Sequence, residues 1–212
     1  MKIEVSGRTD RGDSHVENED SIIIEEKKAL FAVADGVTLP YGGREASTRA
    51  LKYLIELFDG DLESTVKKVN SKLYNEREKV HSIGSTTLTA AHMKDDTLEI
   101  AHVGDSCALI LRDDAVRKIT QDDSFPGTSM LTQVIGQKDV RVHVYEEKVR
   151  KGDIIFLATD GVTNYLSEDE VLTIIKKYSG AEEWINEMFI CIENKTRIYK
   201  DDKSVIIISV KE

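Results

Sequence analysis

The order of apolar patterns along this 212-residue chain predicts an α+β fold, an α/β/β/α sandwich of two packed antiparallel β-sheets flanked by pairs of helices. Two observations carry this prediction. Strand patterns and helix patterns come in blocks, whereas a doubly wound parallel sheet would need them to alternate singly. Many of the strand patterns are short and separated by Asp-rich turns, which is typical of antiparallel hairpins.

The first half of the chain predicts strands, then helices, then hairpins. Apolar residues at helical spacing identify the helices, and short β-rich runs around Asp-Asp pairs identify the hairpins. The predicted elements are strands at 21–26 and 29–34 around a Lys27-Lys28 turn, helices at 44–58 and from Leu62 to Val80, and hairpins over 85–119 with turns at 95–96 and 113–114.

The second half predicts two more strands, two helices and a last strand. Ser167 with Glu170 three residues later is a capping box, which marks a helix start. The predicted elements are strands at 140–149 and 154–158 around a Lys151-Gly152-Asp153 turn, helices with apolar faces at 171–178 and 181–192, and a strand at 205–210.

Composition is that of a globular chain with an acidic surface. Hydrophobic residues make up 40% and charged residues 32%, which suits a single domain spanning residues 1–212. The formal charge of −10 disfavours nucleic acid and membrane surfaces as partners. Cys107 and Cys191 form no metal motif, and there is no apolar leader. We therefore expect a cytoplasmic monomer with reduced thiols.

Carboxylates stand where the apolar strands begin or end. If these acids converge on one rim of the sandwich, their mutual repulsion raises several pKa values unless cations lie among them. An all-oxygen site without a thiolate or imidazole motif favours magnesium, manganese or calcium. The positions are Glu19-Asp20, Asp35-Gly36, Asp105, Asp160-Gly161 and Asp201-Asp202.

In order and spacing, these pieces resemble the metal-dependent serine/threonine protein phosphatases of type 2C, across nearly the whole chain. Each piece alone is weakly specific, and the ordered set is strongly so. The matching segments are Asn18-Glu19-Asp20, Ala34-Asp35-Gly36 with Gly43 and Ala46-Ser47, Gly84-Ser85-Thr86, Val103-Gly104-Asp105-Ser106, 131–136, Gly152-Asp153, Thr159-Asp160-Gly161 and 201–205.

The resemblance implies a catalytic centre with two Mn²⁺ or Mg²⁺ ions and a third, weaker metal position. Asp35 would bridge the two ions beside the carbonyl of Gly36, and Asp160 with Asp201 would hold the first. Glu19 or Asp20 would hold the second, directly or through water, and Asp105 with Asp160 would form the third position. The implied reaction is hydrolysis of phosphoserine or phosphothreonine in proteins, the products of a serine/threonine kinase, by a water that bridges the two cations.

Several positions depart from the family pattern. His15 stands where an arginine usually grips the substrate phosphate. Two interpretations stay open: His15 is a weaker phosphate contact, or it is a surface residue and Arg8 or Arg11 replaces the arginine. The loop Val37 to Pro40 replaces one that ends in histidine, Asn164 replaces an aspartate, and Asp202 stands where Asn is common. Between Asp123-Ser124 and Leu131-Thr132 only six residues remain, so the flap that borders the active site is nearly deleted.

Two functions remain open on sequence alone. The four retained acids Asp20, Asp35, Asp160 and Asp201 favour an active phosphatase. His15 and the short flap favour an alternative, a weakly active or inactive relative that acts as a phosphoprotein-binding module. A manganese-dependent phosphatase assay would separate them.

Overall fold

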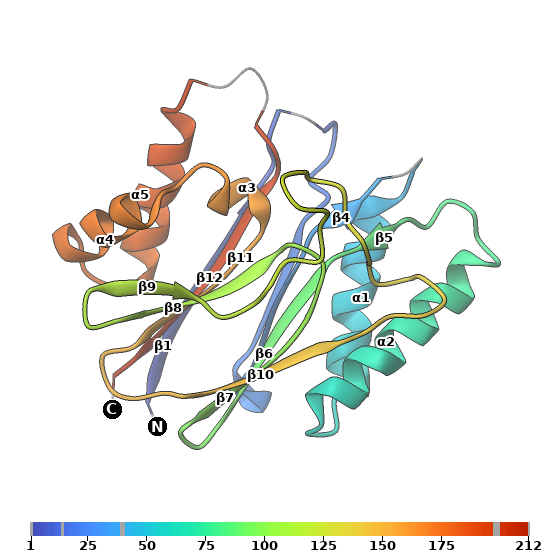
Figure 1. Ribbon diagram of the computed structural model, residues 1–212, viewed down its shortest axis with the longest axis horizontal. Helices are drawn as coiled ribbons and strands as arrows, with labels where there is room; N and C mark the ends of the chain where they lie inside the picture. Colours follow the sequence, from blue (N-terminus) through green and yellow to red (C-terminus); the bar gives the residue numbers. More distant parts are fainter. Residues whose placement is uncertain (1, 14, 39–40, 197–199, 212) are drawn as a thin grey trace.

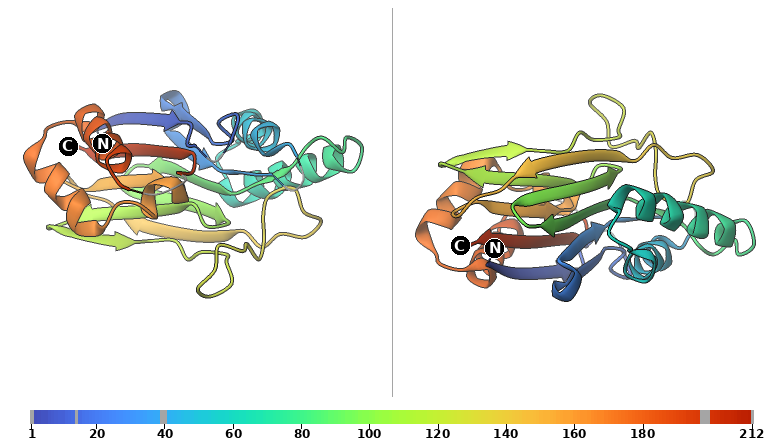
Figure 2. Two further views of the ribbon diagram at one scale, coloured as in Figure 1. Left: turned by 90° about the horizontal axis from the view of Figure 1, so that it is seen from above. Right: turned by 90° about the horizontal axis from the view of Figure 1, so that it is seen from below.

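Four layers stack in the order helix pair, sheet, sheet, helix pair in the computed structural model (Figures 1 and 2). The structure describes residues 2–13, 15–38, 41–196 and 200–211. Both sheets are antiparallel throughout. The predicted sandwich is thus confirmed.

The first sheet has the strand order β1-β12-β11-β8-β9, and the second has β10-β7-β6-β3-β2. A two-stranded ribbon, β4 with β5, lies beside the second sheet. The bounds are β1 Ile3–Asp10, β2 Ser21–Glu25, β3 Leu30–Ala34, β4 Gly36–Val37, β5 Ser85–Thr86, β6 Leu88–Lys94, β7 Thr97–Val103, β8 Cys107–Arg112, β9 Ala115–Lys118, β10 His143–Lys148, β11 Ile154–Ala158 and β12 Lys203–Val210.

The helices divide between the two outer faces. Helices α1 and α2 cover the second sheet, while α4 and α5 cover the first (Figure 2). Short α3 begins directly after β11. The bounds are η1 Glu26–Lys28, α1 Gly43–Leu57, α2 Leu62–Arg77, α3 Asp160–Thr163, α4 Glu168–Lys177 and α5 Ala181–Glu193.

Strand β12 shows why the central strands are apolar at every position. Val205 and Ile207 pack toward α4 and α5, whereas Ile206 and Ile208 pack between the sheets. Successive strand residues point to opposite faces, so a strand with helices on one side and a sheet on the other needs both faces apolar. This double burial makes the site-bearing ends of the strands rigid.

The local turn chemistry follows the sequence. Asp113 and Asp114 both have positive φ, 51° and 63°, in the two-residue turn between β8 and β9. A two-residue hairpin with positive φ at both central positions favours Asn, Asp and Gly. Ser167 and Glu170 form the predicted capping box at the start of α4. Both local predictions are confirmed.

Three expectations about elements were wrong. Val80 lies beyond α2 and is 46% exposed, because the helix ends at Arg77. The expected strand at 140–149 is shorter, and it lies in the second sheet while β11 lies in the first. Strand β1 was missed, because only Ile3 and Val5 of its eight residues are large and apolar, which is a weak signal. Among the described residues, each helix is too short or too polar to cross a bilayer.

Candidate metal centre

Strand pairing brings the acids to one end of the sandwich. The register places Ser21 opposite Ala34, so Asp20 before β2 and Asp35 after β3 lie at the same end. Likewise Ala158 pairs with Val205, which brings Asp160 after β11 beside the segment that enters β12. The first pair comes from one sheet and the second from the other. The acids therefore meet where the two sheets face each other.

Asp35 is the electrostatic middle of this group. Its pKa is raised well above the ordinary value, first by burial away from water and then by the negative charges of other predicted acids. The acids that act on it are Asp20, Asp160, Asp105 and Asp201. These four aspartates are thus close enough to Asp35 to oppose its ionisation.

The pKa values of three neighbouring aspartates are raised as well. Burial, and the charges of neighbouring carboxylates to a smaller extent, raise the pKa of Asp20 to about 7, although hydrogen bonds from Ser204 and Thr159 act in the opposite direction. Burial and the charges of Asp105 and Asp201 raise the pKa of Asp160 to about 7. Burial and the charge of Asp122 raise the pKa of Asp105 to about 6. A positive charge among these groups would restore their ionised forms at neutral pH.

The hydrogen-bond inventory indicates where such a charge fits. Among the described residues, buried side-chain oxygens without a partner occur on Glu19 (Oε2), Asp20 (Oδ1) and Asp160 (Oδ1). A buried carboxylate oxygen without a partner is costly, and hard divalent cations take such oxygens as ligands. The residues present therefore fit the predicted magnesium or manganese pair.

Two predicted ligands have additional contacts. Glu19 accepts a hydrogen bond from the Thr38 hydroxyl at its Oε1, at 2.5 Å, which leaves Oε2 for a cation. Gly36 donates its N–H to the Glu19 carbonyl at 3.2 Å, so the two predicted ligand segments touch. A Cβ at Gly36 would lie 2.3 Å from the Gly43 carbonyl carbon, so only glycine allows this approach.

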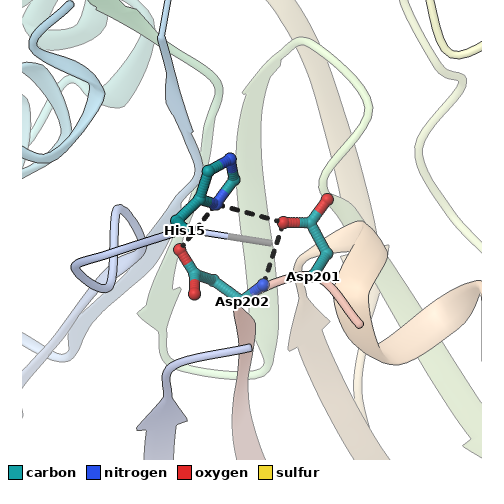
Figure 3. Close-up of side chains that lie close together, drawn as sticks. All are labelled: His15, Asp201 and Asp202. Atoms are coloured by element: carbon teal, nitrogen blue, oxygen red, sulfur yellow. Dashed lines mark hydrogen bonds and ion pairs between the residues drawn. The ribbon is translucent and has the colours of Figure 1, made fainter. Parts of the chain in front are cut away.

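His15 lies beside Asp201 and Asp202, as Figure 3 shows. Its Nδ1 is 3.3 Å from Asp202 Oδ2 and 3.6 Å from Asp201 Oδ1, and its Nε2 is 3.9 Å from Glu19 Oε2. Ligand atoms of His15, Asp201 and Asp202 all lie within 4.8 Å of one another. Two departures from the family pattern, at positions 15 and 202, are therefore in contact.

Asp202 has a role that the sequence reasoning missed. Its Oδ1 accepts the N–H of Gly12 at 2.8 Å and its Oδ2 accepts the N–H of Glu19 at 2.7 Å. The side chain thus ties both ends of the loop that carries His15 to the start of β12. No signal in the sequence distinguishes this carboxylate from its neighbour Asp201, because the distinction depends on two backbone groups almost two hundred residues away.

Substitution of Asp202 should lower the free energy of unfolding even in the metal-free protein. Asp202 is 3% exposed, and Asp202→Ala leaves two backbone N–H groups without their charged acceptor. We expect a loss of about 2–4 kcal/mol in the free energy of unfolding, measured by urea denaturation without metal. The exposed Asp139→Ala is the matched control, with an expected change within about 0.5 kcal/mol. Equal midpoints for the two variants would contradict this role.

Two glycines allow the backbone to close around this segment. A Cβ at Gly161 would lie 1.8 Å from the Asp202 carbonyl oxygen, and one at Gly12 would lie 2.2 Å from the Asp201 carbonyl oxygen. Asn164, at the departed aspartate position, donates to Asp160 Oδ2 at 3.1 Å. The amide thus binds the carboxylate that an aspartate would repel. Leu39 and Pro40, in the altered loop, lie outside the described residues.

The comparisons with known proteins all point to one family. Residues 11–200 match the family model described as protein phosphatase 2C. The serine/threonine phosphatase stp of Listeria innocua is 29% identical over 205 residues, which cover 80% of this chain and 81% of that protein. The serine/threonine protein phosphatase PstP of Mycobacterium tuberculosis is 27% identical over 210 residues, 86% of this chain and 40% of that longer protein.

Solved structures share the fold. The crystal structure of M. tuberculosis PstP/Ppp superposes with a TM-score of 0.89 at 24% identity, covering 99% of both chains. The catalytic domain of PstP in complex with two manganese ions superposes with a TM-score of 0.87, again at 24% identity and 99% of both chains. Since the family model covers most of the sequence and the fold agrees, this chain belongs to the protein phosphatase 2C family.

Proposed function

We propose that this protein hydrolyses phosphoserine and phosphothreonine in proteins with a pair of Mn²⁺ or Mg²⁺ ions held by Asp20, Asp35, Asp160 and Asp201. The observation that carries the proposal is the set of partnerless, buried carboxylate oxygens within a group of acids whose pKa values are raised. A module that only binds phosphate would repel its ligand with so many acids and no cation.

The chain's own residues would bind and orient the cations and the substrate. Asp35, opposed by acids from both sheets, is the best placed to bridge two ions, with the Gly36 carbonyl beside it. Glu19 would act on one side and Asp105 at the weaker third position. When bound, the cations supply the positive charge that activates a water and neutralises phosphate oxygens.

The substrates we propose are phosphoproteins made by a serine/threonine kinase. Relatives named serine/threonine phosphatases support this class. We also propose that residues 1–212 act as one phosphatase domain, because the acids come from both sheets. Action in the cytoplasm is consistent with the two free cysteines, since unpaired thiols persist in reducing compartments.

The deciding assay measures hydrolysis of a phosphothreonine peptide and of p-nitrophenyl phosphate. We expect activity with added manganese or magnesium and loss of at least about a hundredfold with excess EDTA, because the cations supply the charge. Full activity in EDTA would exclude a mechanism that depends on two metal ions. Tight phosphopeptide binding without turnover in saturating manganese would favour the binding module.

His15 is the proposed phosphate contact on the substrate side. Its ring lies among Asp202, Asp201 and Glu19, so it faces the same centre. We expect His15→Ala to raise KM for a phosphopeptide by about 3- to 10-fold, because one hydrogen bond to a charged group is lost. Steady-state kinetics at saturating manganese measure this, with His81→Ala as the exposed control. Equal KM values would show that phosphate is held by other groups.

A further inference from the structure

A deep pocket of about 600 Å³ opens directly beside the metal centre. Asp105 and Asp160 line both the pocket and the acidic group. The pocket extends away from them along the outer face of the first sheet, where its lining residues come from β8, β9, β11, β12, α3, α4 and α5 (Figure 1 shows these elements). Asp105 and Asp160 are predicted metal ligands at one end of the pocket, and the other lining residues have no role in binding the cations.

Strand register shows how the floor is built. Val205, Ala158 and Cys107 are laterally paired across β12, β11 and β8, and all three line the pocket. Phe156 and Leu109 form the next pair along the same strands. The row nearest the acids contains only small or medium side chains, and this leaves space above the sheet.

The walls are mixed: Lys118, Asp122 and Glu168 line the pocket together with several apolar side chains. Val162 and Leu166 reach the pocket from α3 and the segment after it, Val171 from α4 and Val116 from the edge strand β9. The floor itself consists of the apolar side chains Leu109, Phe156, Ala158 and Val205 with the Cys107 thiol. A charged ligand group placed on this floor would lose hydration, whereas an aliphatic or aromatic group would lose none.

One side of the pocket is the short segment between Asp123 and Leu131. Ser124, Gly127, Thr128 and Ser129 of this segment line the pocket. Phe125 and Met130, in the same segment, are 51% and 65% exposed and point to solvent instead of filling the space. The pocket is therefore open to a molecule that is already bound at the acids.

The distance from the acids suits a neighbouring residue of the substrate. Ala158 lies two residues before Asp160 and Cys107 lies two residues after Asp105, and two residues of chain span at most about 7 Å. Side chains one or two positions from a phosphoresidue in an extended peptide lie within the same range. The volume is ample for a leucine or phenylalanine side chain.

We propose that this pocket is a substrate subsite, which receives a large apolar side chain one or two positions from the phosphoresidue. The inference rests on the proposed phosphatase function and specifies the sequence around the phosphate that it prefers. The continuity of the pocket with the acidic centre, and the apolar side chains of its floor, carry the assignment. Val116, Val171 and Leu166 determine its specificity.

The first experiment compares phosphothreonine peptides that differ at a single position. Each position from −3 to +3 is set in turn to Ala, Leu, Phe or Glu, and kcat/KM is measured with saturating manganese. We expect Leu or Phe at one or two positions to exceed Ala by about tenfold or more, because a buried large side chain contributes this much. A flat profile, or a preference for Glu, overturns the subsite.

Pocket-filling variants assign the preference to this space. Val116 faces the pocket from β9, and Ala115 lies on the opposite face of the same strand. Val116→Trp should reduce the Leu-to-Ala ratio of kcat/KM to about 1–2, while Ala115→Trp should keep the wild-type ratio. On α4, Val171→Trp with its exposed control Thr173→Trp repeats the comparison if a β9 variant does not fold. An unchanged ratio in both filled variants overturns the proposal.

A binding measurement is independent of turnover. Met188 lines the pocket, whereas Met93 lies between the two sheets. In protein labelled with [methyl-¹³C]methionine, a phosphonate peptide that cannot be hydrolysed should shift the Met188 resonance only when it carries Leu or Phe. Met93 should not respond. A shift that is equal for the Ala peptide, or absent for all, overturns the subsite.

Failure of the proposed function and failure of the subsite give different results. If neither p-nitrophenyl phosphate nor any peptide is hydrolysed with manganese, the proposed function fails, and the subsite that rests on it fails too. If both are hydrolysed without preference and Met188 does not respond, the function stands and the subsite fails. Preference that persists after Phe125→Ala excludes the chain's own aromatic residue as its source.

Discussion

Asp35→Asn is expected to reduce kcat at saturating manganese by about a thousandfold or more. Asp35 is the group on which the charges of Asp20, Asp105, Asp160 and Asp201 all act, so it occupies the middle of the proposed centre. The amide has the same shape but no charge, and one of its two oxygen ligands becomes an N–H₂ donor. The variant would therefore hold the two cations with one negative charge and one oxygen ligand fewer.

The measurement pairs turnover with metal affinity. Steady-state kinetics on p-nitrophenyl phosphate over a manganese titration separate weaker metal binding from slower chemistry. Circular dichroism and thermal unfolding check that the variant keeps the fold. Asp139→Asn, on the exposed surface, is the isosteric control and should retain full kcat. Near-normal turnover of Asp35→Asn at saturating metal would place the centre elsewhere.

The metal-free protein should become more stable as the pH falls from 8 to about 5. Burial raises the pKa of Asp20 and of Asp160 to about 7, and that of Asp105 to about 6, from an ordinary value of 3.8. Between the ordinary and the raised values, the folded protein holds protons that the unfolded chain has lost. The stabilisation is complete below the ordinary pKa and is lost as the pH rises through the folded-state pKa.

With saturating manganese the trend should reverse. The cations require ionised carboxylates, so acid weakens their binding and the stability that this binding contributes. We expect the metal-free Tm to rise by at least about 5 °C from pH 8 to pH 5, and the Tm with metal to fall over the same range. Asp160→Asn should flatten the metal-free slope. A metal-free Tm that falls steadily on acidification would contradict the proximity of these acids.

The sequence predicted those parts of the fold whose signals are local. Helix periodicity, Asp-Asp hairpin turns and the Ser167 capping box each depend on a few adjacent residues, and each was confirmed except for the end of α2, which stops at Arg77 before Val80. The approach of Asp35 to Asp160 was predicted from their shared position at strand ends. It holds because antiparallel pairing returns those ends to one edge of each sheet.

Features that depend on distant partners could not be predicted. Asp202 looks like a second ligand beside Asp201, yet its two oxygens hold backbone groups of the loop after β1. Strand β1 has little apolar periodicity of its own and is identified only through its eight-residue pairing with β12. The pocket behind Asp105 depends on which small residues align across three strands, and that register is not written in any one segment.

The pairing of β1 with β12 also determines where the two ends of the chain lie. Ile3 pairs with Val210 at one end of the ladder and Asp10 pairs with Lys203 at the other, next to the acids. Eight strand residues separate the two ends by about 25 Å. Both chain ends thus leave the molecule side by side, on the side away from the centre (Figure 1). A fluorescent protein, an affinity handle or a chip surface attached at either end would leave the proposed metal centre unobstructed.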